Sequence, residues 1–148
     1  MSNLLNSPHK AQIYSKIDLC HAYHLVYITN SDEWKTAFRT HYRSFEWSII
    51  PFSLTNAPVA FQWFINNIFS NLLDVCVVIY LDDILIYLNN MSEHYWHVKE
   101  VFKHLYKISL NAKAEKCKFH SKLVEYLGYI LSSSGFTMSD DKVKIIQD

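Results

Sequence analysis

The chain has 148 residues, of which half are hydrophobic and 16% are aromatic, and its 14 basic side chains balance its 14 acidic ones. This composition excludes a disordered polypeptide and predicts one folded domain with its own core. Because the net charge is zero, total charge gives no argument for nucleic-acid binding. Residues 99–122 are nevertheless locally basic, with seven lysines and two glutamates. These lysines could form either a solvated helix face or a strip that faces phosphates.

Apolar length and cysteine usage bear on where the protein works. The longest apolar runs, residues 75–81 and 84–88, are much shorter than the roughly 18 residues of a membrane-spanning helix, and residues 1–10 contain no apolar segment typical of a signal peptide. The three cysteines, an odd number at wide spacing, favour a reduced protein. We therefore expect an intracellular protein, in the cytoplasm or nucleus, that is neither secreted nor bound to a membrane.

The first half of the chain predicts short strands followed by one clear helix. Residues 14–19 form a candidate strand that ends at Asp18, and β-branched and aromatic residues favour further strands at 25–28, 35–40 and 45–50. A helix is predicted over residues 55–73, because Thr55 or Asn56 can cap it, Pro58 stands in its first turn, and apolar residues recur at helical spacing.

The second half predicts a hairpin, a helix and more strands. Residues 75–80 and 84–88 are short, apolar and β-branched, which indicates a β-hairpin with Asp82 and Asp83 at its tip. A helix over residues 92–108 has one apolar face and one face of lysines, strands return between 116 and 131, and Ser139 caps a further helix that runs to residue 148. Together these elements predict an α+β domain with an antiparallel sheet.

Adjacent carboxylates between apolar strands call for a cation. Asp82 and Asp83 repel each other and lose hydration there, which is costly unless positive charge neutralises them, and Mg²⁺ prefers such oxygen ligands. Neighbouring strand residues point to opposite faces, so the turn must rotate one of the two. If the strand of Asp18 lies beside the hairpin, three carboxylates could hold two ions about 4 Å apart. The alternative is an ordinary solvated turn.

Several collinear motifs extend this hypothesis along nearly the whole chain. They are Ser15–Leu19, Ala22–His24, Asp32–Thr40, Pro51–Phe52, Leu54–Pro58, Phe61–Gln62, Tyr80–Tyr87, Glu93–His94, His97, Ala112–Lys113, Lys116–Cys117 and Tyr126–Gly128. In these motifs the sequence resembles the reverse transcriptases of gypsy-type LTR retrotransposons, with residues 11–131 best matched. The resemblance implies a polymerase palm, an antiparallel sheet with helices packed on one face and the catalytic hairpin at its centre.

The resemblance also implies an activity and a set of site residues. The activity is RNA-directed DNA polymerisation, in which two Mg²⁺ ions, or Mn²⁺, support addition of deoxynucleotides to a primer 3′-hydroxyl. The catalytic and metal-binding residues would be Asp18, Asp82 and Asp83, and Tyr23 would be the aromatic gate against ribonucleotides. The other implied residues contact the nucleotide (His21, Ala22, Phe52, Ser53) or form the primer grip and contact nucleic acid (Tyr126, Leu127, Gly128, Tyr80). The implied partners are an RNA or DNA template with its primer, deoxynucleoside triphosphates and the rest of a Pol polyprotein.

Departures from the family pattern leave other functions open. Ser53 and Arg43 stand where the family commonly has glycine, and residues 1–148 would form a partial reverse transcriptase domain, with 139–148 starting a truncated helix and most of the fingers, the thumb, ribonuclease H and integrase outside it. The chain could therefore be a catalytically inactive remnant or a nucleic-acid binding module. A metal-dependent phosphohydrolase would share the carboxylates but not explain Tyr23. The pairs His94/His97 and Cys117/His120 also mimic zinc-ligand spacing.

Overall fold

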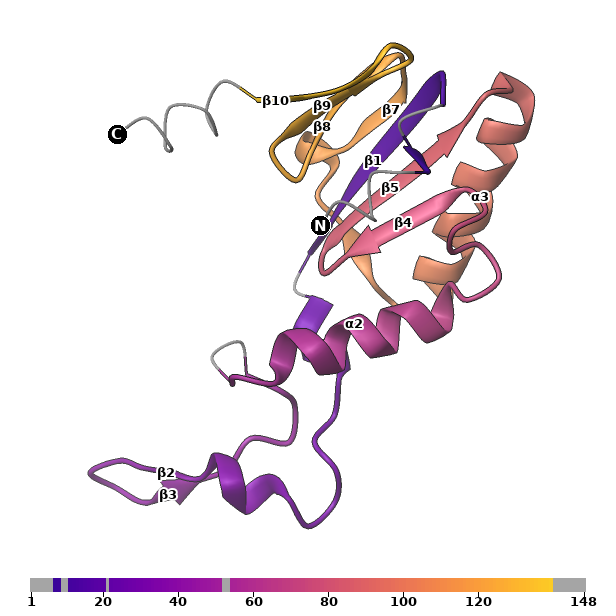
Figure 1. Cartoon of the computed structure of the whole chain (residues 1–148). Helices are drawn as coiled ribbons and strands as arrows, with labels where there is room; N and C mark the ends of the chain where they lie inside the picture. Colours follow the sequence, from indigo (N-terminus) through magenta and orange to yellow (C-terminus); the bar gives the residue numbers. More distant parts are fainter. Residues whose placement is uncertain (1–6, 9–10, 21, 52–53, 140–148) are drawn as a thin grey trace, which may run out of the picture.

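Figure 1 shows the computed structural model of the chain, which describes residues 7–8, 11–20, 22–51 and 54–139. Its main sheet is built around β1 (Ile13–Cys20), which pairs with β5 (Asp83–Leu88) on one side. On its other side β1 pairs with β6 (Asn111–Ala112) and β7 (Lys118–Ser121), and β4 (Val77–Tyr80) pairs with β5. All these pairings are antiparallel, so the predicted hairpin β4–β5 joins the sheet through β5.

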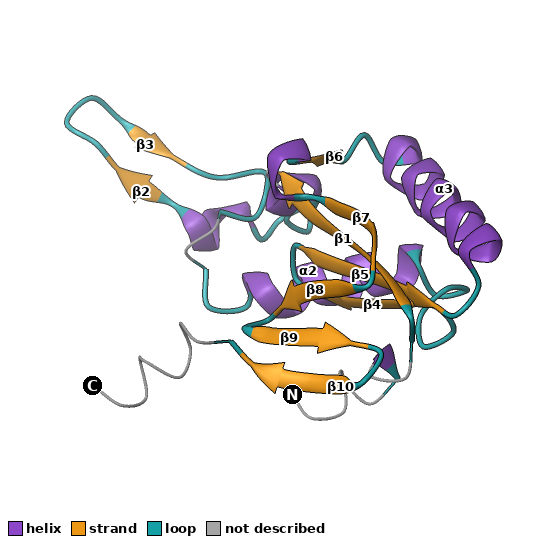
Figure 2. Ribbon diagram, turned by 90° about the horizontal axis from the view of Figure 1, so that it is seen from above, coloured by secondary structure: helices purple, strands orange, loops and turns teal. Residues whose placement is uncertain are grey.

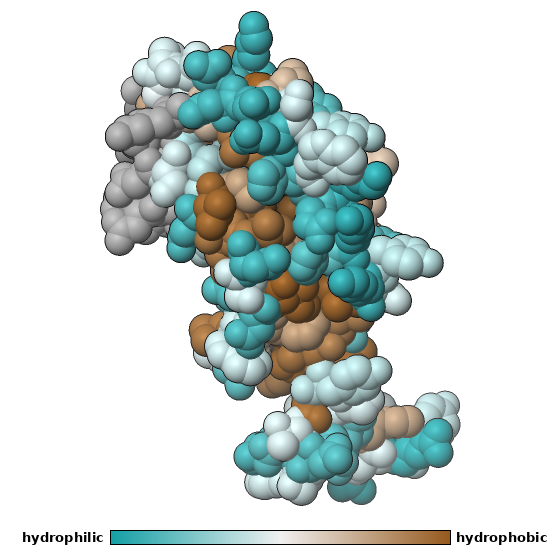
Figure 3. Space-filling model, turned by 90° about the vertical axis from the view of Figure 1, so that its right-hand side faces the viewer, coloured by the Kyte–Doolittle hydropathy of each residue, from teal (hydrophilic) through white to brown (hydrophobic). Residues whose placement is uncertain are grey.

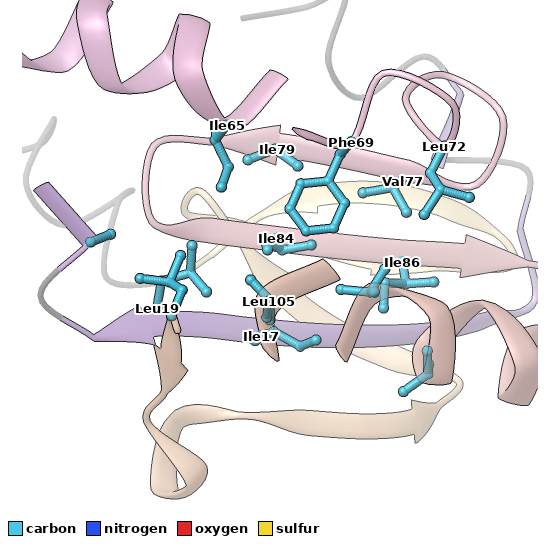
Figure 4. Close-up of a cluster of buried hydrophobic side chains, with 14 of the residues drawn as sticks. Ile17, Leu19, Ile65, Phe69, Leu72, Val77, Ile79, Ile84, Ile86 and Leu105 are labelled. Carbon is cyan, nitrogen blue, oxygen red and sulfur yellow. The ribbon is translucent and has the colours of Figure 1, made fainter. Parts of the chain in front are cut away.

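Two helices cover one face of this sheet. They are α2 (Ala57–Ile68) and α3 (Met91–Lys107), and both contribute to one buried cluster with alternate residues of the strands. Figure 4 shows Ile65 and Phe69 close to Ile79 and Ile84, with Leu105 of α3 near Ile17. Each fully buried side chain of this size contributes roughly 1.5–3 kcal/mol. The predicted helical layer on one face of an antiparallel sheet is confirmed.

A second sheet covers the opposite face. It consists of β8 (Leu123–Tyr126), β9 (Tyr129–Ser132) and β10 (Gly135–Met138), which pair antiparallel in chain order. Its buried residues Val124, Tyr126 and Leu131 pack with those of the main sheet that point away from the helices, namely Tyr14, Val78, Leu85 and Tyr87. The strands expected between 116 and 131 are present, and β10 extends the series.

The helix limits differ slightly from the prediction. Pro58 lies in the first turn of α2, as expected, but Asn56 at the N-cap position makes no side-chain capping hydrogen bond, and α2 ends at Ile68 rather than at residue 73. From Phe69 the backbone turns back, since the amide of Leu72 donates to the carbonyl of Phe69 and Asp74 has a φ of 60°. Phe69 and Leu72 still reach the same core, which is why the apolar spacing continued past the helix end. The helix predicted over residues 92–108 begins one residue earlier, with Asn90 accepting from the Ser92 amide.

The strands predicted between residues 25 and 50 are mostly wrong. The structure has 3-10 helices at Ala22–Leu25 and Glu33–Thr36, a bridge between Tyr27 and Ile49, and a short hairpin of β2 (Phe38–Arg39) and β3 (Ser44–Phe45). Figure 2 shows this hairpin projecting from the body, where longer strands would find no partner. Arg43 in its turn is not at positive φ and its guanidinium lies 4.8 Å from the Phe45 ring centre, so its backbone does not require glycine.

A buried polar contact joins β1, α3 and β7. Ser15 of β1 and His94 of α3 are fully buried, and Ser15 Oγ lies 2.8 Å from His94 Nε2. The backbone amide of His120 at β7 donates to the same Oγ, so the Ser15 hydroxyl links β1 to both α3 and β7. Burial and the neighbouring His120 and His97 lower the pKa of His94 to about 4.

Two sequence expectations concern the ends and the membrane. The helix expected from Ser139 falls on residues 140–148, which lie outside the described residues. Within the described ranges, no helix has both the length and the apolar character needed to cross a membrane.

Candidate active site

The strand register brings the early aspartate to the hairpin. Asp18 of β1 is the direct antiparallel partner of Asp83 at the start of β5. The neighbouring amide of Leu19 donates to the carbonyl of Asp82 over 2.8 Å, which fixes the hairpin turn against β1. The expected meeting of a carboxylate distant in sequence with the hairpin pair is therefore present in the fold. Since Asp83 and Asp18 are cross-strand partners, their side chains lie on the same face of the sheet.

The turn that carries Asp82 is held in a strained shape. Tyr80 pairs with Asp83, so Leu81 and Asp82 form a two-residue turn, and Leu81 has a φ of 54°, which is costly for a residue with a bulky side chain. The side chain of Gln62 on α2 stabilises it: Oε1 accepts from the Leu81 amide at 2.8 Å and Nε2 donates to the Ile79 carbonyl at 3.1 Å. This turn breaks the strand alternation at Leu81 and Asp82, and the convergence of the Asp82 and Asp83 side chains on one site stays a prediction.

Two lysines contact the carboxylates. Lys16 Nζ lies 3.3 Å from Asp83 Oδ1, and Lys113 Nζ lies 3.0 Å from Asp18 Oδ1. Both Oδ1 atoms are buried, and apart from these lysine contacts they have no hydrogen-bond partner within the described part of the chain. Burial raises the pKa of Asp83, Lys16 opposes that shift, and the nearby Asp82 and Asp18 add to it. The hydrogen bond to Asp18 is the main cause that raises the pKa of Lys113.

The donor set suits a hard divalent cation. Mg²⁺ prefers carboxylate oxygens as ligands, and here two of them are buried with few hydrogen bonds while Asp82 and Asp18 lie close enough to raise the pKa of Asp83. Among the described residues, however, no three His, Cys, Asp or Glu side chains stand in a ready metal-binding group. The residues fit the ion by chemistry and neighbourhood, and their coordination of a metal stays a prediction.

Tyr126 supports the hairpin from beneath. It is fully buried, and its hydroxyl donates to the Asp83 carbonyl at 3.2 Å. Burial, aided by the charge of Asp83, raises its pKa. The side chain is thus not available for nucleic acid in this structure, contrary to the expected contact, and it acts as a positioning group. Tyr80 is partly exposed on β4.

The predicted primer grip contains a tight turn. Leu127 and Gly128 connect β8 to β9 and have φ values of 52° and 76°, as in a hairpin turn with both central residues at positive φ. Both residues are partly exposed, and the Gly128 carbonyl accepts from the Ser139 amide. Their contact with a primer stays a prediction.

Most of the predicted nucleotide contacts cannot be placed. His21, Phe52 and Ser53 lie outside the described residues, as does the side chain of Tyr23, whose backbone belongs to the 3-10 helix that follows β1. The Ala22 side chain is buried in the helix-side core. The roles of these five residues remain predictions from the resemblance.

The sequence reading missed Lys16, Lys113 and Gln62 as parts of the site. For Lys16 a signal existed, because it precedes Asp18 by two positions on a strand and therefore shares its face. No comparable local signal marked Lys113 or Gln62, because the contact of Lys113 depends on how β6 pairs with β1 and that of Gln62 on how α2 packs against the hairpin.

The lysine-rich segment is divided between two places. Lys99, Lys103 and Lys107 of α3 line a groove of about 1160 Å³ together with Phe102, Tyr106 and Phe119, whereas Lys113 turns to Asp18. Figure 3 faces the α3 side and shows apolar residues in the middle of this surface with hydrophilic residues around them. Three of the four residues with zinc-ligand spacing contact other protein groups instead. His94 contacts Ser15, His97 Nδ1 contacts the Glu93 carbonyl, and Cys117 Sγ donates to the Lys113 carbonyl.

The antiparallel sheet, its two covering helices and the acidic hairpin that meets β1 are those of a polymerase palm. The chain belongs to the reverse transcriptase family, since the family model described as "Reverse transcriptase (RNA-dependent DNA polymerase)" matches residues 1–131.

Relatives and solved structures agree with this membership. The chain is 38% identical to the Transposon Tf2-3 and Tf2-7 polyproteins of Schizosaccharomyces pombe (strain 972 / ATCC 24843), in alignments that cover 99% of the chain but 11% of each polyprotein. It is similar in fold to the foamy viral protease-reverse transcriptase in complex with an RNA/DNA hybrid, with a TM-score of 0.84, 24% identity, and coverage of 98% of this chain and 20% of that one. The foamy viral protease-reverse transcriptase dRH in complex with double-stranded DNA gives a TM-score of 0.86 at 24% identity, over 99% of this chain and 26% of that chain.

Proposed function

We propose that this chain is the catalytic palm of an RNA-directed DNA polymerase from a gypsy-type LTR retrotransposon, acting as part of a Pol polyprotein. The observation that carries the proposal is the register of Asp18 opposite Asp83, with Asp82 in the adjoining turn. Family membership and the transposon polyprotein relatives support the reaction class.

The three carboxylates would serve nucleotidyl transfer with two divalent metal ions. Bound Mg²⁺ would activate the primer 3′-hydroxyl and stabilise the leaving pyrophosphate. Asp18 and Asp83 would hold these ions from neighbouring strand ends, and Asp82 from the turn that Gln62 fixes. Because the fold positions the ligands and the substrates align in line, the protein needs no covalent nucleophile.

Substrate and partner contacts complete the proposal. Tyr23 would exclude ribonucleotides, and the backbone near His21 and Ala22 together with Phe52 and Ser53 would meet the deoxynucleoside triphosphate. The template with its primer would pass the β8–β9 turn at Leu127 and Gly128. We further propose that the protein acts inside the cell, in the cytoplasm or nucleus, with the fingers, thumb, ribonuclease H and integrase of its polyprotein.

Primer extension tests this function. The chain would replace the corresponding segment of a complete, active polymerase of the transposon type, and extension of a DNA primer on an RNA template would be compared for the parent and Asp82→Asn. We expect Asp82→Asn to lose activity by at least ~100-fold, because the carboxylate is replaced by a neutral amide that binds Mg²⁺ poorly. Asp32→Asn, an exposed acid paired with Lys35, is the matched control and should leave activity unchanged.

Failure of extension would point to the alternative. If the chimera with the parent chain folds but shows no more extension than Asp82→Asn, the chain is a catalytically inactive remnant. Retained binding of a primer-template in that case would favour a nucleic-acid binding module, for which the lysines along α3 offer a surface.

A further inference from the structure

Lys16 and Lys113 are the cations that the fold places against the acidic site. Each nitrogen contacts the buried Oδ1 of one aspartate, at 3.3 Å for Lys16 with Asp83 and 3.0 Å for Lys113 with Asp18. The side chains of Asp83 and Asp18 are 25% and 14% exposed, so part of each side chain still reaches the surface although its Oδ1 is buried. The lysines therefore hold the inner oxygens from the protein side.

The backbone places the base of each lysine side chain close to its aspartate. Lys16 lies on β1 two residues before Asp18, and its strand partner is Leu85, so it stands diagonally across from Asp83. The Lys113 amide donates to the Asp18 carbonyl at 2.8 Å, directly after the pairing of β6 with β1. Both lysine side chains are partly covered, with exposed fractions of 23% and 31%. These ion pairs are thus better fixed than ordinary surface pairs, which contribute little.

The lysines change the charge of the site. Three carboxylates carry three negative charges, and two ammonium groups leave a net charge of about −1 by simple addition. A divalent ion at the carboxylates would lie within roughly 6 Å of each ammonium nitrogen, given metal–oxygen distances of about 2 Å. Repulsion at that distance weakens metal binding by about tenfold per lysine even with the dielectric constant of water, and more in a partly buried site.

We propose that Lys16 and Lys113 are positioning residues that neutralise and orient Asp83 and Asp18, and that they hold the affinity of the site for a divalent metal low. This inference rests on the proposed metal-dependent function. A triphosphate that brings further negative charge would then be needed to draw metal into the site. The lysines thereby tie metal binding to the arrival of the substrate.

Metal binding by the chain itself tests the proposal. Free Mn²⁺ is titrated with the 148-residue chain and followed by electron paramagnetic resonance, without nucleotide or nucleic acid. We expect Lys16→Met to bind Mn²⁺ about tenfold more tightly or better, and Lys16→Arg, which keeps the charge, to bind like the parent chain. Lys103→Met removes an ion-paired lysine of α3, 2.8 Å from Glu100, and should change nothing.

The outcomes separate this inference from the proposed function. Equal or weaker binding by Lys16→Met than by the parent overturns the role of the lysine while leaving the metal site standing. If the parent, Lys16→Met and Lys113→Met all fail to bind Mn²⁺, and Asp82→Asn behaves like them, both the metal site and this inference fail. Thermal melting with and without Mn²⁺ shows whether each variant is folded, and Lys113→Met with Lys113→Arg repeats the test from the other strand.

Discussion

The buried His94 should make the stability of this fold depend on pH. Its pKa in the folded chain is about 4, against an ordinary value of 6.5, because burial penalises the charged imidazole and His120 and His97 add repulsion. The unfolded chain therefore binds a proton at His94 between these two pH values and the folded chain does not. The free energy of unfolding therefore keeps its full value above pH 6.5. It falls by about 3 kcal/mol in total as the pH decreases toward 4.

A difference measurement isolates His94 from the carboxylates, which also titrate in acid. Urea unfolding is recorded between pH 7.5 and pH 4 for the parent chain and for His94→Gln, which does not titrate. The advantage of the parent over His94→Gln should shrink by roughly 3 kcal/mol across that range. His41→Gln, an exposed histidine between β2 and β3, is the control and should show a much smaller trend. Parallel curves for the parent and His94→Gln, within about 0.5 kcal/mol, would refute the reasoning.

Three further substitutions probe the hairpin and the core. Gln62→Leu removes both hydrogen bonds to the hairpin and should cost about 1–3 kcal/mol in urea unfolding, whereas Asn67→Leu, at an exposed position of the same helix, should cost less; equal losses would contradict the role of Gln62 at the hairpin. Leu81→Gly relieves the positive φ of 54° and should raise the melting temperature, by a gain of up to about 1 kcal/mol; a lower melting temperature would show that the Leu81 side chain matters more than the strain. Phe69→Ala opens a cavity at a fully buried position and should cost about 3–5 kcal/mol by denaturant unfolding; a loss below about 1 kcal/mol would contradict the packing seen around it.

The strands and helices that could be predicted are those whose pattern repeats over many residues. The alternation in β1 and the stripe of α3 follow from a local rule, since one face of each must be buried. The segment between residues 25 and 50 escaped prediction, because aromatic residues there suggested strands although Tyr27, Trp34 and Trp47 are exposed in the structure. Residue types can favour a strand, but they do not show whether another strand is available to pair with it.

The three aspartates of the acidic site were named from the sequence, but most of the residues that contact them were not. Asp82 and Asp83 stood out because carboxylates interrupt apolar strands, Asp18 stood at the end of another such strand, and the resemblance implied the same three residues. The burial of Tyr126 beneath Asp83 was not predicted. A tyrosine has an apolar ring and a polar hydroxyl, so the sequence alone does not decide whether the side chain is buried or exposed. Direct contacts of Tyr23 with a nucleotide remain a prediction.

The sequence by itself determined the α+β class, the acidic hairpin and the helix that follows it, because spacing along the chain sets which residues share a face. Only the tertiary structure decided that Asp18 stands opposite Asp83, that Gln62 holds the turn, and that Lys16 and Lys113 contact the carboxylates. These contacts join residues as far apart as 18 and 113, and their energies depend on strand register and on the way that α2 and β6 pack. Neither the strand register nor the packing of α2 and β6 can be deduced from a short stretch of the chain.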